Sequence, residues 1–315
     1  MNFNKFLSIC LFILICISYQ APITMVLGGD VMVARGIAEI QSQNPAYAPF
    51  EGITPLLQSA NLAAANLESP FGTKFSFSMD TESGVYNLCA APEGVEIIQN
   101  TFHLFSTANN HEMDCGDFNQ TMTMLEQAGV TPLTGSFQPV WISVKGQQLA
   151  FFAFDDVKTS IDLPGAQFAV RVARRLTPYV IVSIHWGQEY HPGQNSRQIE
   201  IGQGLADAGA LVIWGHHPHV LQPLNIIQGA EQRNPTLIAY SLGNLLFDQV
   251  TPPGARLSTL LEINLSQQRV QNIALHPLEI DPFSGIIFPA DSENSQWIRH
   301  RLLEYFPALY PSFVR

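Results

Sequence analysis

The sequence is poor in charged residues, and in basic residues above all. Asp, Glu, Lys and Arg make up 13% of the 315 residues, whereas an average globular chain has about 25%. Lys and Arg number 15 against 26 Asp and Glu, which gives a formal net charge of −11. A protein that binds the phosphate backbone of a nucleic acid needs a basic face. The composition therefore argues against a nucleic-acid partner, and acidity alone names no other.

Cysteine is scarce as well. Cys10 and Cys16 lie in the apolar N-terminal stretch, which leaves Cys89 and Cys115 in the rest of the chain. The sequence contains no Cys-x-x-Cys pair and no Cys/His spacing typical of a structural zinc site. In an exported chain the remaining two cysteines could form a disulfide. Two buried thiols are an equally good interpretation of the sequence.

No apolar run approaches the roughly 20 residues that a transmembrane helix needs. The N-terminal run Phe6–Ile17 is shorter, is interrupted only by Ser8 and follows Lys5. This pattern is typical of a secretory signal. We expect residues 1–18 to be a signal peptide cleaved after Ser18, with an uncleaved anchor as the alternative. The protein would then be exported to the periplasm or to the outer face of the cytoplasmic membrane.

Long linkers, low-complexity blocks and internal repeats are also missing. Instead, short apolar runs alternate with helical stretches, which favours an α/β fold. We predict strands at Ile23–Leu27, Leu62–Asn66, His103–Thr107, Leu149–Phe154, Tyr179–His185, Ala210–Trp214, Leu237–Ser241 and Leu257–Ile263, and helices at Glu93–Gln99, Asp117–Gly129, Ser196–Ala208 and Gln296–Tyr305. Residues 257–278 lack a helical period. We therefore expect one domain over residues 19–250, with residues 251–315 as its β-rich extension and terminal helix.

The informative polar residues stand where these strands end. In open α/β sheets, ligands bind beyond the carboxyl ends of the strands. The residues at or just after these ends are Asp30, Glu68, Asn109, Asn110, His111, His185, His216, His217, His219 and Asn244. Each of them alone could be a turn cap, a loop acid or a core histidine. Their recurrence at strand after strand favours a shared site.

The histidines after the strand Ala210–Trp214 give the strongest signal. His216, His217 and His219 follow Gly215 within a few residues, and three imidazoles there are a poor packing solution. His217 and His219 are two residues apart, so an extended segment would point both to one side. Imidazole together with carboxylate and amide oxygens suits Mn²⁺, Zn²⁺ or Fe²⁺. Because no thiolate is present, the set is typical of a catalytic metal site, with one or two ions.

Six ordered segments carry a resemblance to a known family. They are Gly29–Arg35 (GDVMVAR), Ala65–Glu68 (ANLE), Ala108–Gly116 (ANNHEMDCG), His185–Tyr190 (HWGQEY), Gly215–Pro223 (GHHPHVLQP) and Tyr240–Asp248 (YSLGNLLFD). Together they resemble the CapA family of capsule, or poly-γ-glutamate, biosynthesis proteins. The resemblance implies the fold of the calcineurin-like metallophosphoesterases, a sandwich of two β-sheets flanked by helices. It also implies an extracytoplasmic role in making, exporting or anchoring an anionic envelope polymer.

Carried over residue by residue, the resemblance assigns roles to seven side chains. It implies that Asp30 is a first-site metal ligand and that Glu68 takes the place of a bridging Asp. His111 would stabilise the transition state or the leaving group. The remaining ligands would be Asn110, His185, His217 and His219.

The sequence departs from the phosphoesterase pattern at some positions. Those enzymes begin with Asp-x-His, whereas Met32 stands where the histidine would be. Arg35, Glu189, His216 and Asn244 are further candidate site residues without an assigned counterpart. Arg35 could pair with a carboxylate or phosphate of a substrate, or form a structural ion pair. Glu189 could orient His185, or be an ordinary loop acid.

Two classes of function fit these observations. One is a metal-dependent hydrolase or transferase that acts on an envelope polymer or its phosphorylated precursor. The other is a non-catalytic scaffold that supports the subunits of a membrane synthase or exporter. The presence of Asn110-His111 and His217-x-His219 favours the enzyme, and Met32 favours the scaffold.

Overall fold

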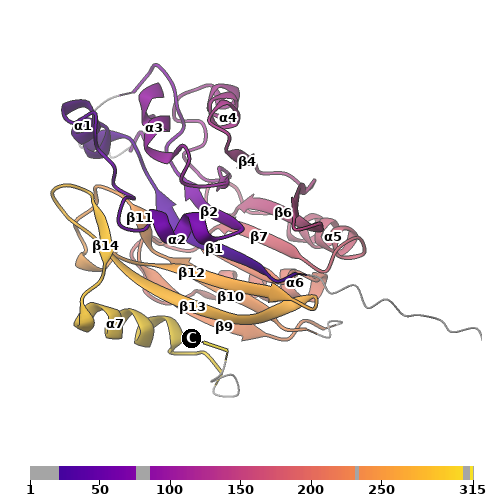
Figure 1. Ribbon diagram of the computed structural model, residues 1–315. Helices are drawn as coiled ribbons and strands as arrows, with labels where there is room; N and C mark the ends of the chain where they lie inside the picture. The colour runs from indigo at the N-terminus through magenta and orange to yellow at the C-terminus, as the bar shows by residue number, and fades with distance from the viewer. Residues whose placement is uncertain (1–20, 76–85, 231–233, 308–312, 315) are drawn as a thin grey trace, which may run out of the picture.

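Two β-sheets packed face to face form the centre of the molecule (Figure 1). The computed structural model describes residues 21–75, 86–230, 234–307 and 313–314, so the expected signal peptide lies outside the described residues. One sheet has eight strands and the other has six. The two-sheet α/β fold expected from the sequence is confirmed.

The larger sheet has the order β14-β13-β12-β1-β2-β3-β4, and β11 pairs with β1. These strands are β1 (Ile23–Val31), β2 (Leu62–Leu67), β3 (Leu104–Ser106), β4 (Thr131–Leu133), β11 (Asn244–Leu246), β12 (Leu257–Ser266), β13 (Arg269–Ile280) and β14 (Ile287–Pro289). The segment without helical period is thus the antiparallel pair β12 and β13, as predicted. Strand β12 also pairs antiparallel with β1, which joins the C-terminal part of the chain to the first strand.

The smaller sheet has the order β5-β6-β7-β8-β10-β9. Its strands are β5 (Val140–Val144), β6 (Gln147–Asp155), β7 (Val180–His185), β8 (Val212–His216), β9 (Leu221–Ile227) and β10 (Thr236–Leu242). Strands β6, β7, β8 and β10 run parallel to one another, as do β1 to β4 in the larger sheet. Parallel strands bring their carboxyl ends to one edge of each sheet, which is the edge where ligands bind.

The alternation of side chains along β6 explains why the strand is apolar throughout. Leu149 and Phe151 face the core between the two sheets, whereas Phe152 and Phe154 face the helices outside. Successive side chains of a strand point to opposite faces, so a strand that is covered on both faces is apolar at every position. The high apolar content of the sequence thus fits a four-layer arrangement.

Helices cover the outer face of each sheet (Figure 1). On the larger sheet these are α1 (Arg35–Gln43), α2 (Thr54–Ser59), α3 (Val95–Ile98) and α4 (Phe118–Gln127), and on the smaller sheet α5 (Leu163–Arg174) and α6 (Ser196–Ala208). Short 3₁₀ helices, Pro92–Gly94 and Pro253–Arg256, and the C-terminal helix α7 (Ser292–Leu303) complete the described elements. No helix among the described residues has the length and apolarity needed to cross a membrane.

Capping residues explain where the predicted helices begin. Asp117 caps α4 by accepting a hydrogen bond from the backbone of Asn119, close to the predicted start. Helix α6 has its predicted bounds and a capping box formed by Asn195 and Gln198. Helix α7 begins four residues earlier than expected because Asp291 caps it. Helices α1, α2 and α5 were not predicted, and α1 and α2 have no side-chain cap that the sequence could have revealed.

Candidate metal centre

The two sheets bring the predicted residues to one edge of the sandwich. Asp30 lies near the end of β1 and Glu68 follows β2 directly. His185 is the last residue of β7, and in the register of the smaller sheet it faces His216, the last residue of β8. Asn244 at the start of β11 is the register partner of Asp30. All five side chains are buried.

Asp30 belongs to a strand and does not cap a turn. The backbone N–H of Asp30 donates to Gly243 O at 3.0 Å, where β1 approaches the neighbouring segment closely. A Cβ on Gly29 would lie only 1.8 Å from the same carbonyl oxygen. Gly29 is therefore required for close approach of two backbones, and this approach fixes the position of the Asp30 carboxylate.

Asp30, Glu68 and His219 form a fully buried group with one potential ligand atom each, all within 4.8 Å of one another. His219 Nδ1 lies 3.4 Å from Asp30 Oδ2, and its Nε2 lies 3.9 Å from Glu68 Oε2. The amide of Asn244 orients the ring, because its Oδ1 is 2.9 Å from His219 Nδ1 while its Nδ2 donates to Ala255 O. In the neutral ring this arrangement places the hydrogen on Nδ1 and leaves Nε2 as the candidate ligand atom.

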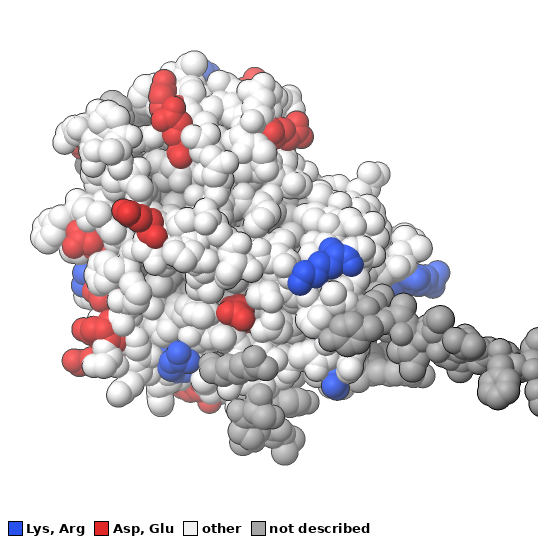
Figure 2. Space-filling model, viewed as in Figure 1, with Lys and Arg blue, Asp and Glu red and all other residues white. Residues whose placement is uncertain are grey.

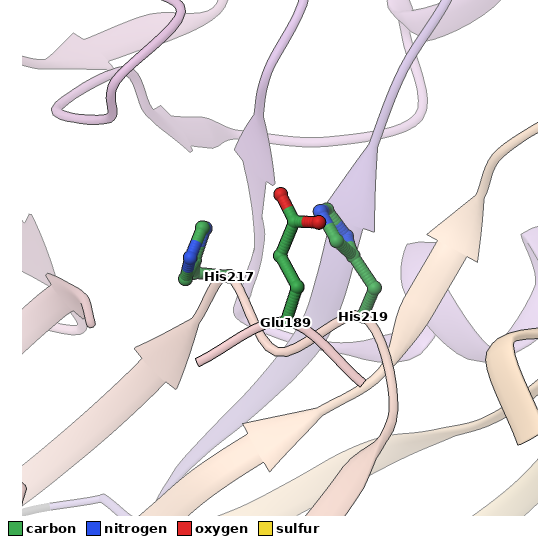
Figure 3. Close-up of side chains that lie close together, drawn as sticks. All are labelled: Glu189, His217 and His219. Atoms are coloured by element: carbon green, nitrogen blue, oxygen red, sulfur yellow. The ribbon is translucent and has the colours of Figure 1, made fainter. Parts of the chain in front are cut away.

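Glu189, His217 and His219 form a second group with the same spacing, and the two groups share His219. Figure 3 shows the Glu189 carboxylate reaching from the loop after β7 toward the space between the two imidazoles. Glu189 is exposed, whereas both histidines are buried. Among the described contacts Glu189 makes no hydrogen bond to His185, so the orienting role considered for it is not supported. Its carboxylate is placed to act as a ligand on the open side of the centre.

The backbone at His217 and His219 differs from the extended segment expected. Strand β8 ends at His216, and both later residues have positive φ, 95° for His217 and 57° for His219. Their rings nevertheless lie close, with centroids 5.9 Å apart. Non-glycine residues adopt this region uncommonly, and buried positions of this kind are found often at functional sites. Two left-handed residues, rather than a strand, therefore bring both imidazoles into the centre.

Asn110 extends the centre across the two sheets. Its Oδ1 lies 2.8 Å from His185 Nε2, and that nitrogen lies 3.9 Å from Glu68 Oε1. The loop after β3 thus meets the ends of β2 and β7. The predicted ligands Asp30, Glu68, Asn110, His185, His217 and His219 lie in one connected cluster, and their role as ligands stays a prediction.

Two buried amides support the acids: Asn66, which the sequence did not single out, and Asn109, which it named as a strand-end residue. Asn66 Nδ2 donates to Asp30 Oδ1 at 2.9 Å and to Glu68 Oε1 at 3.4 Å. Asn109 donates to the backbone oxygen of Leu67 at 2.8 Å, which ties the loop after β3 to the end of β2. Both amides lie inside the quoted segments ANLE and ANNHE. For Asn66, its place in the segment ANLE was a signal that could have been used.

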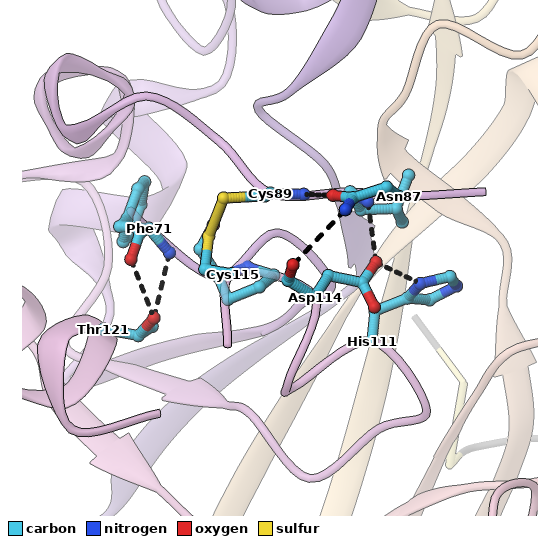
Figure 4. Close-up of a disulfide and its surroundings, with 9 residues drawn as sticks. Phe71, Asn87, Cys89, His111, Asp114, Cys115 and Thr121 are labelled. Carbon is cyan, nitrogen blue, oxygen red and sulfur yellow. Dashed lines mark hydrogen bonds and ion pairs between the residues drawn. A yellow bond between two sulfur atoms is a disulfide. The ribbon is translucent and has the colours of Figure 1, made fainter. Parts of the chain in front are cut away.

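His111 lies at the edge of the cluster and is paired with an acid. Its Nδ1 lies 2.9 Å from Asp114 Oδ2, and the side chain is partly exposed. Next to this pair, Cys89 and Cys115 form a disulfide whose two residues are buried (Figure 4). The structure thus decides between the two interpretations of these cysteines.

Arg35 is held in a buried ion pair. Its guanidinium pairs with Asp248, which also accepts a hydrogen bond from the backbone of Gly36 at 3.1 Å. The guanidinium lies 5.5 Å from the ring centre of Phe247 and 5.9 Å from that of Tyr86. Of the two interpretations of Arg35, a structural ion pair is the one that the structure shows. This pair connects the start of α1 to the segment that follows β11.

Burial and neighbouring charges shift the pKa values of the two central acids, Asp30 and Glu68, in opposite directions. Burial alone would raise the pKa of Asp30, but the close imidazoles of His216 and His219 hold that pKa well below its usual range. Burial raises the pKa of Glu68 well above its ordinary value, and the nearby charge of Asp30 raises it further. In the metal-free protein, Asp30 is thus the carboxylate, while Glu68 resists ionisation beside it.

The pKa values of the buried histidines also differ widely from one another. Burial and the neighbouring His217 lower the pKa of His185 well below its usual range. Burial, with His219 next in importance, lowers the pKa of His217 to about 4. For His219, burial is outweighed by Glu68 and Asp30, which raise its pKa to about 9. The cluster therefore holds an imidazolium at His219 among acids, where a cation could replace its charge.

Within the described part of the chain, four buried polar atoms of the cluster have no hydrogen-bond partner. They are Glu68 Oε2, His185 Nδ1 and both ring nitrogens of His216. His216 Nδ1 lies 3.3 Å from Asp30 Oδ1 without hydrogen-bond geometry. Unpartnered buried polar atoms are rare in native proteins and call for an explanation, such as a bound ion. Acceptor atoms of the imidazole and carboxylate type fit a divalent cation.

A cleft of about 720 Å³ lies elsewhere in the molecule, at the opposite ends of the strands. Its lining includes Leu62, His103 and Lys145, and none of the candidate ligands. Hollow volume alone does not identify the functional site here. The convergence of polar groups at the strand ends does.

Two sheets flanked by helices, with imidazoles, carboxylates and amides meeting at the ends of parallel strands, define an α/β protein with a candidate metal centre. The chain belongs to the family described as bacterial capsule synthesis protein PGA_cap, which matches residues 24–249. The resemblance to the CapA family is thereby confirmed.

Two relatives carry names that agree with this family. The chain is 28% identical to the PGA biosynthesis protein CapA of Bacillus subtilis (strain 168), over 87% of this chain and 76% of the relative. It is 26% identical to the capsule biosynthesis protein CapA of Bacillus anthracis, over 72% of this chain, and it spans 60% of that relative's length. These relatives support a role in capsule or poly-γ-glutamate (PGA) biosynthesis.

One solved structure has a similar fold. It is the crystal structure of a hypothetical protein from Thermus thermophilus, with a TM-score of 0.50 and 14% sequence identity. The match covers 81% of this chain and 99% of that chain. This likeness concerns the fold alone.

Proposed function

We propose that this protein is an exported, divalent-metal-dependent hydrolase or transferase of the phosphoesterase type. It acts on an anionic envelope polymer of the capsule or poly-γ-glutamate kind, or on the precursor of that polymer. The observation that carries this proposal is the buried group Asp30, Glu68 and His219, which shares His219 with Glu189 and His217. Candidate ligands from both sheets meet there.

The candidate ligands of such a site form two sets. Asp30, Glu68 and His219 would hold one ion, and Asn110, His185 and His217, which lie close to one another, would hold a second. When bound, such an ion supplies Lewis acidity toward a phosphoryl or carbonyl oxygen and toward water. Mn²⁺, Zn²⁺ and Fe²⁺ all suit this donor set.

His111 is the candidate general acid of this site. Its Nδ1 is engaged by Asp114, so Nε2 is the nitrogen from which the doubly protonated ring can give a proton to a leaving oxygen. The side chain is partly exposed, whereas the candidate ligand histidines are buried, so a substrate can reach it. Asn110, its neighbour in sequence, holds the same loop against His185.

The surface gives an anionic polymer little direct attraction. On the face shown in Figure 2, Lys and Arg side chains stand singly and Asp and Glu side chains are spread widely. The buried guanidinium of Arg35 already pairs with Asp248. A bound cation would therefore be the main positive charge offered to the polymer or its precursor.

The scaffold of a membrane synthase or exporter is the second candidate function. It is favoured by Met32, which is fully buried and whose sulfur accepts a hydrogen bond from the backbone N–H of Ala34. The phosphoesterases have a ligand histidine at this position. Here the Met32 sulfur instead forms a local hydrogen bond with the backbone. A site with fewer ligands could bind a metal without turning over a substrate.

A turnover assay separates the two candidates. The purified chain is incubated with Mn²⁺ or Zn²⁺ and with a phosphodiester or polyglutamate substrate, beside the Asp30→Ala, His217→Ala double variant. Metal-dependent hydrolysis by the wild type alone would support the enzyme. Metal binding without turnover of any substrate would favour the scaffold.

A further inference from the structure

A carboxylate outside the predicted site holds the loop that carries Asn110 and His111. Asp114 Oδ2 lies 2.9 Å from His111 Nδ1 and accepts a hydrogen bond of 2.7 Å from the backbone N–H of Leu88 (Figure 4). Leu88 belongs to a different loop, beside Cys89. One carboxylate oxygen thus joins the candidate general acid to a distant segment of the chain.

We propose that Asp114 is a positioning residue for His111, and that the Cys89–Cys115 disulfide anchors Asp114 in place. The inference rests on the proposed function only for the chemical role given to His111. The arrangement of Asp114, His111 and the disulfide is independent of any metal. Asp114 acts through the imidazole: among the described residues its carboxylate bonds to His111 and Leu88 and not to the candidate metal ligands.

The hydrogen bond between Asp114 and His111 determines which nitrogen of the imidazole carries the hydrogen. An ionised carboxylate has only acceptor sites, so the hydrogen between Asp114 Oδ2 and His111 lies on Nδ1. A neutral imidazole has one hydrogen, so Nε2 is then left with a lone pair. An imidazole without this partner exchanges between two tautomers and rotates more freely. Asp114 therefore selects both the orientation and the tautomer of His111.

The disulfide and three hydrogen bonds hold Asp114 from the other side. The backbone N–H of Leu88 donates to its side chain, and Asn87 Nδ2 donates to its backbone oxygen at 3.3 Å. The backbone N–H of Cys89 donates to Asn87 Oδ1 at 2.8 Å, which keeps that amide in place. Cys115 follows Asp114 directly and is bonded to Cys89, 26 residues away. The two loops are therefore joined on both sides of the carboxylate.

The packing around the disulfide leaves it little freedom. Cys89 and Cys115 are buried, and a Cβ on Gly72 would lie 2.8 Å from Cys115 Cβ. Phe71, beside Gly72, is bonded through its backbone N–H to Thr121 of α4 (Figure 4). The anchor is thus built into the packing of α4 on the loop after β2. It lies apart from the candidate ligands.

Nitrogen NMR of the histidine side chains tests the positioning role. The full chain is labelled with ¹⁵N-histidine and examined in alkaline buffer, where ordinary imidazoles are neutral. We expect one tautomer for wild-type His111, with its hydrogen on Nδ1. Asp114→Ala should give a mixture of tautomers, whereas Asp114→Asn should keep the wild-type pattern, because its amide oxygen can accept both donors. The matched control is Asp117→Ala, which removes the cap of α4 and leaves His111 unchanged.

The same NMR experiment also tests whether the disulfide anchors Asp114. The Cys89→Ser, Cys115→Ser double variant retains Asp114 but frees the two loops, and it should move the His111 signals toward the Asp114→Ala pattern. This arm also applies if Asp114→Ala does not fold. A single wild-type tautomer in folded Asp114→Ala would overturn the positioning role. An unchanged His111 in the double cysteine variant would overturn the anchoring role.

Kinetics distinguish a failure of this inference from a failure of the proposed function. If the protein turns over a substrate, Asp114→Ala should lower kcat at least about 10-fold, with KM and metal content unchanged. A purely structural role would instead reduce metal content and stability together. If no substrate is turned over but the tautomer changes as expected, the enzyme proposal is contradicted and the positioning role of Asp114 is supported.

Discussion

His219 and Asn244 are joined by a hydrogen bond of 2.9 Å between Nδ1 and Oδ1 at the buried centre of the cluster. Asn244 is itself fixed, because its Nδ2 donates to the backbone oxygen of Ala255. The ring nitrogen left for a metal is Nε2, which points toward Glu68. The segment YSLGN therefore contributes a residue that orients a ligand.

This relationship predicts the effect of Asn244→Ala on metal affinity. Loss of the amide releases the ring of His219, and loss of such an orienting partner lowers metal affinity by about 10- to 100-fold. Isothermal titration calorimetry with Mn²⁺ or Zn²⁺ measures the change. Asn272→Ala on β13 is the matched control, since Asn272 bonds to Asn264 away from the centre. An affinity equal to that of the control would contradict this role of Asn244.

Metal binding should release protons at neutral pH. The pKa of His219 is raised to about 9 by Glu68 and Asp30 against the effect of burial, so this ring carries a proton below that pH. A cation must displace that proton, and apparent affinity should therefore fall as pH decreases below about 9. His217, with a pKa of about 4, does not compete in this range. Calorimetry in buffers of different ionisation enthalpy counts the protons. Affinity that does not change between about pH 6 and 8 would contradict the charge assignment.

The ion pair of Arg35 and Asp248 should contribute to stability rather than to metal binding. Asp248→Ala leaves a buried guanidinium without its partner, which typically lowers the free energy of unfolding by about 3–5 kcal/mol. Replacing both partners by Arg35→Met, Asp248→Leu should restore much of the loss. Denaturant unfolding measures both variants. Equal destabilisation of the single and double variants would show that the pairing itself is unimportant.

Gly29→Ala should disturb the position of Asp30. The added Cβ would meet Gly243 O at 1.8 Å, so β1 and the segment before β11 must separate. We expect a loss in the free energy of unfolding of at least about 1–3 kcal/mol, the range for overpacking, together with reduced metal content. Gly135→Ala serves as the control, because its Cβ would have an ordinary contact of 3.6 Å with Ala108. Thermal unfolding that is the same for both variants would contradict this close approach.

The sequence was informative where chemistry and strand pattern coincide. Asp30, Glu68 and His185 could be predicted because each stands at the end of an apolar strand, and parallel strands end at a common edge. The order of strands in the two sheets could not be predicted, because pairing between distant strands leaves no local signal. The family resemblance supplied the two-sheet arrangement.

Contacts between loops could not be predicted from the sequence. Asp114 meets Leu88 and His111, and Asp248 meets Arg35 across 213 residues. Neither acid lies on a periodic element, so nothing in the pattern distinguishes it from a solvated loop acid. The left-handed backbone at His217 was also unpredictable, since tertiary contacts hold a conformation that histidine rarely adopts alone.

Metal content tests the central claim most directly. The purified wild-type chain and the Asp30→Ala, His217→Ala double variant are loaded with Mn²⁺ or Zn²⁺, freed of unbound ion and measured by elemental analysis. The convergence of both sheets on Glu68 and His219 predicts one or two tightly held ions in the wild type and a loss of them in the variant. Equal metal content in the two folded proteins would contradict a metal centre at these strand ends.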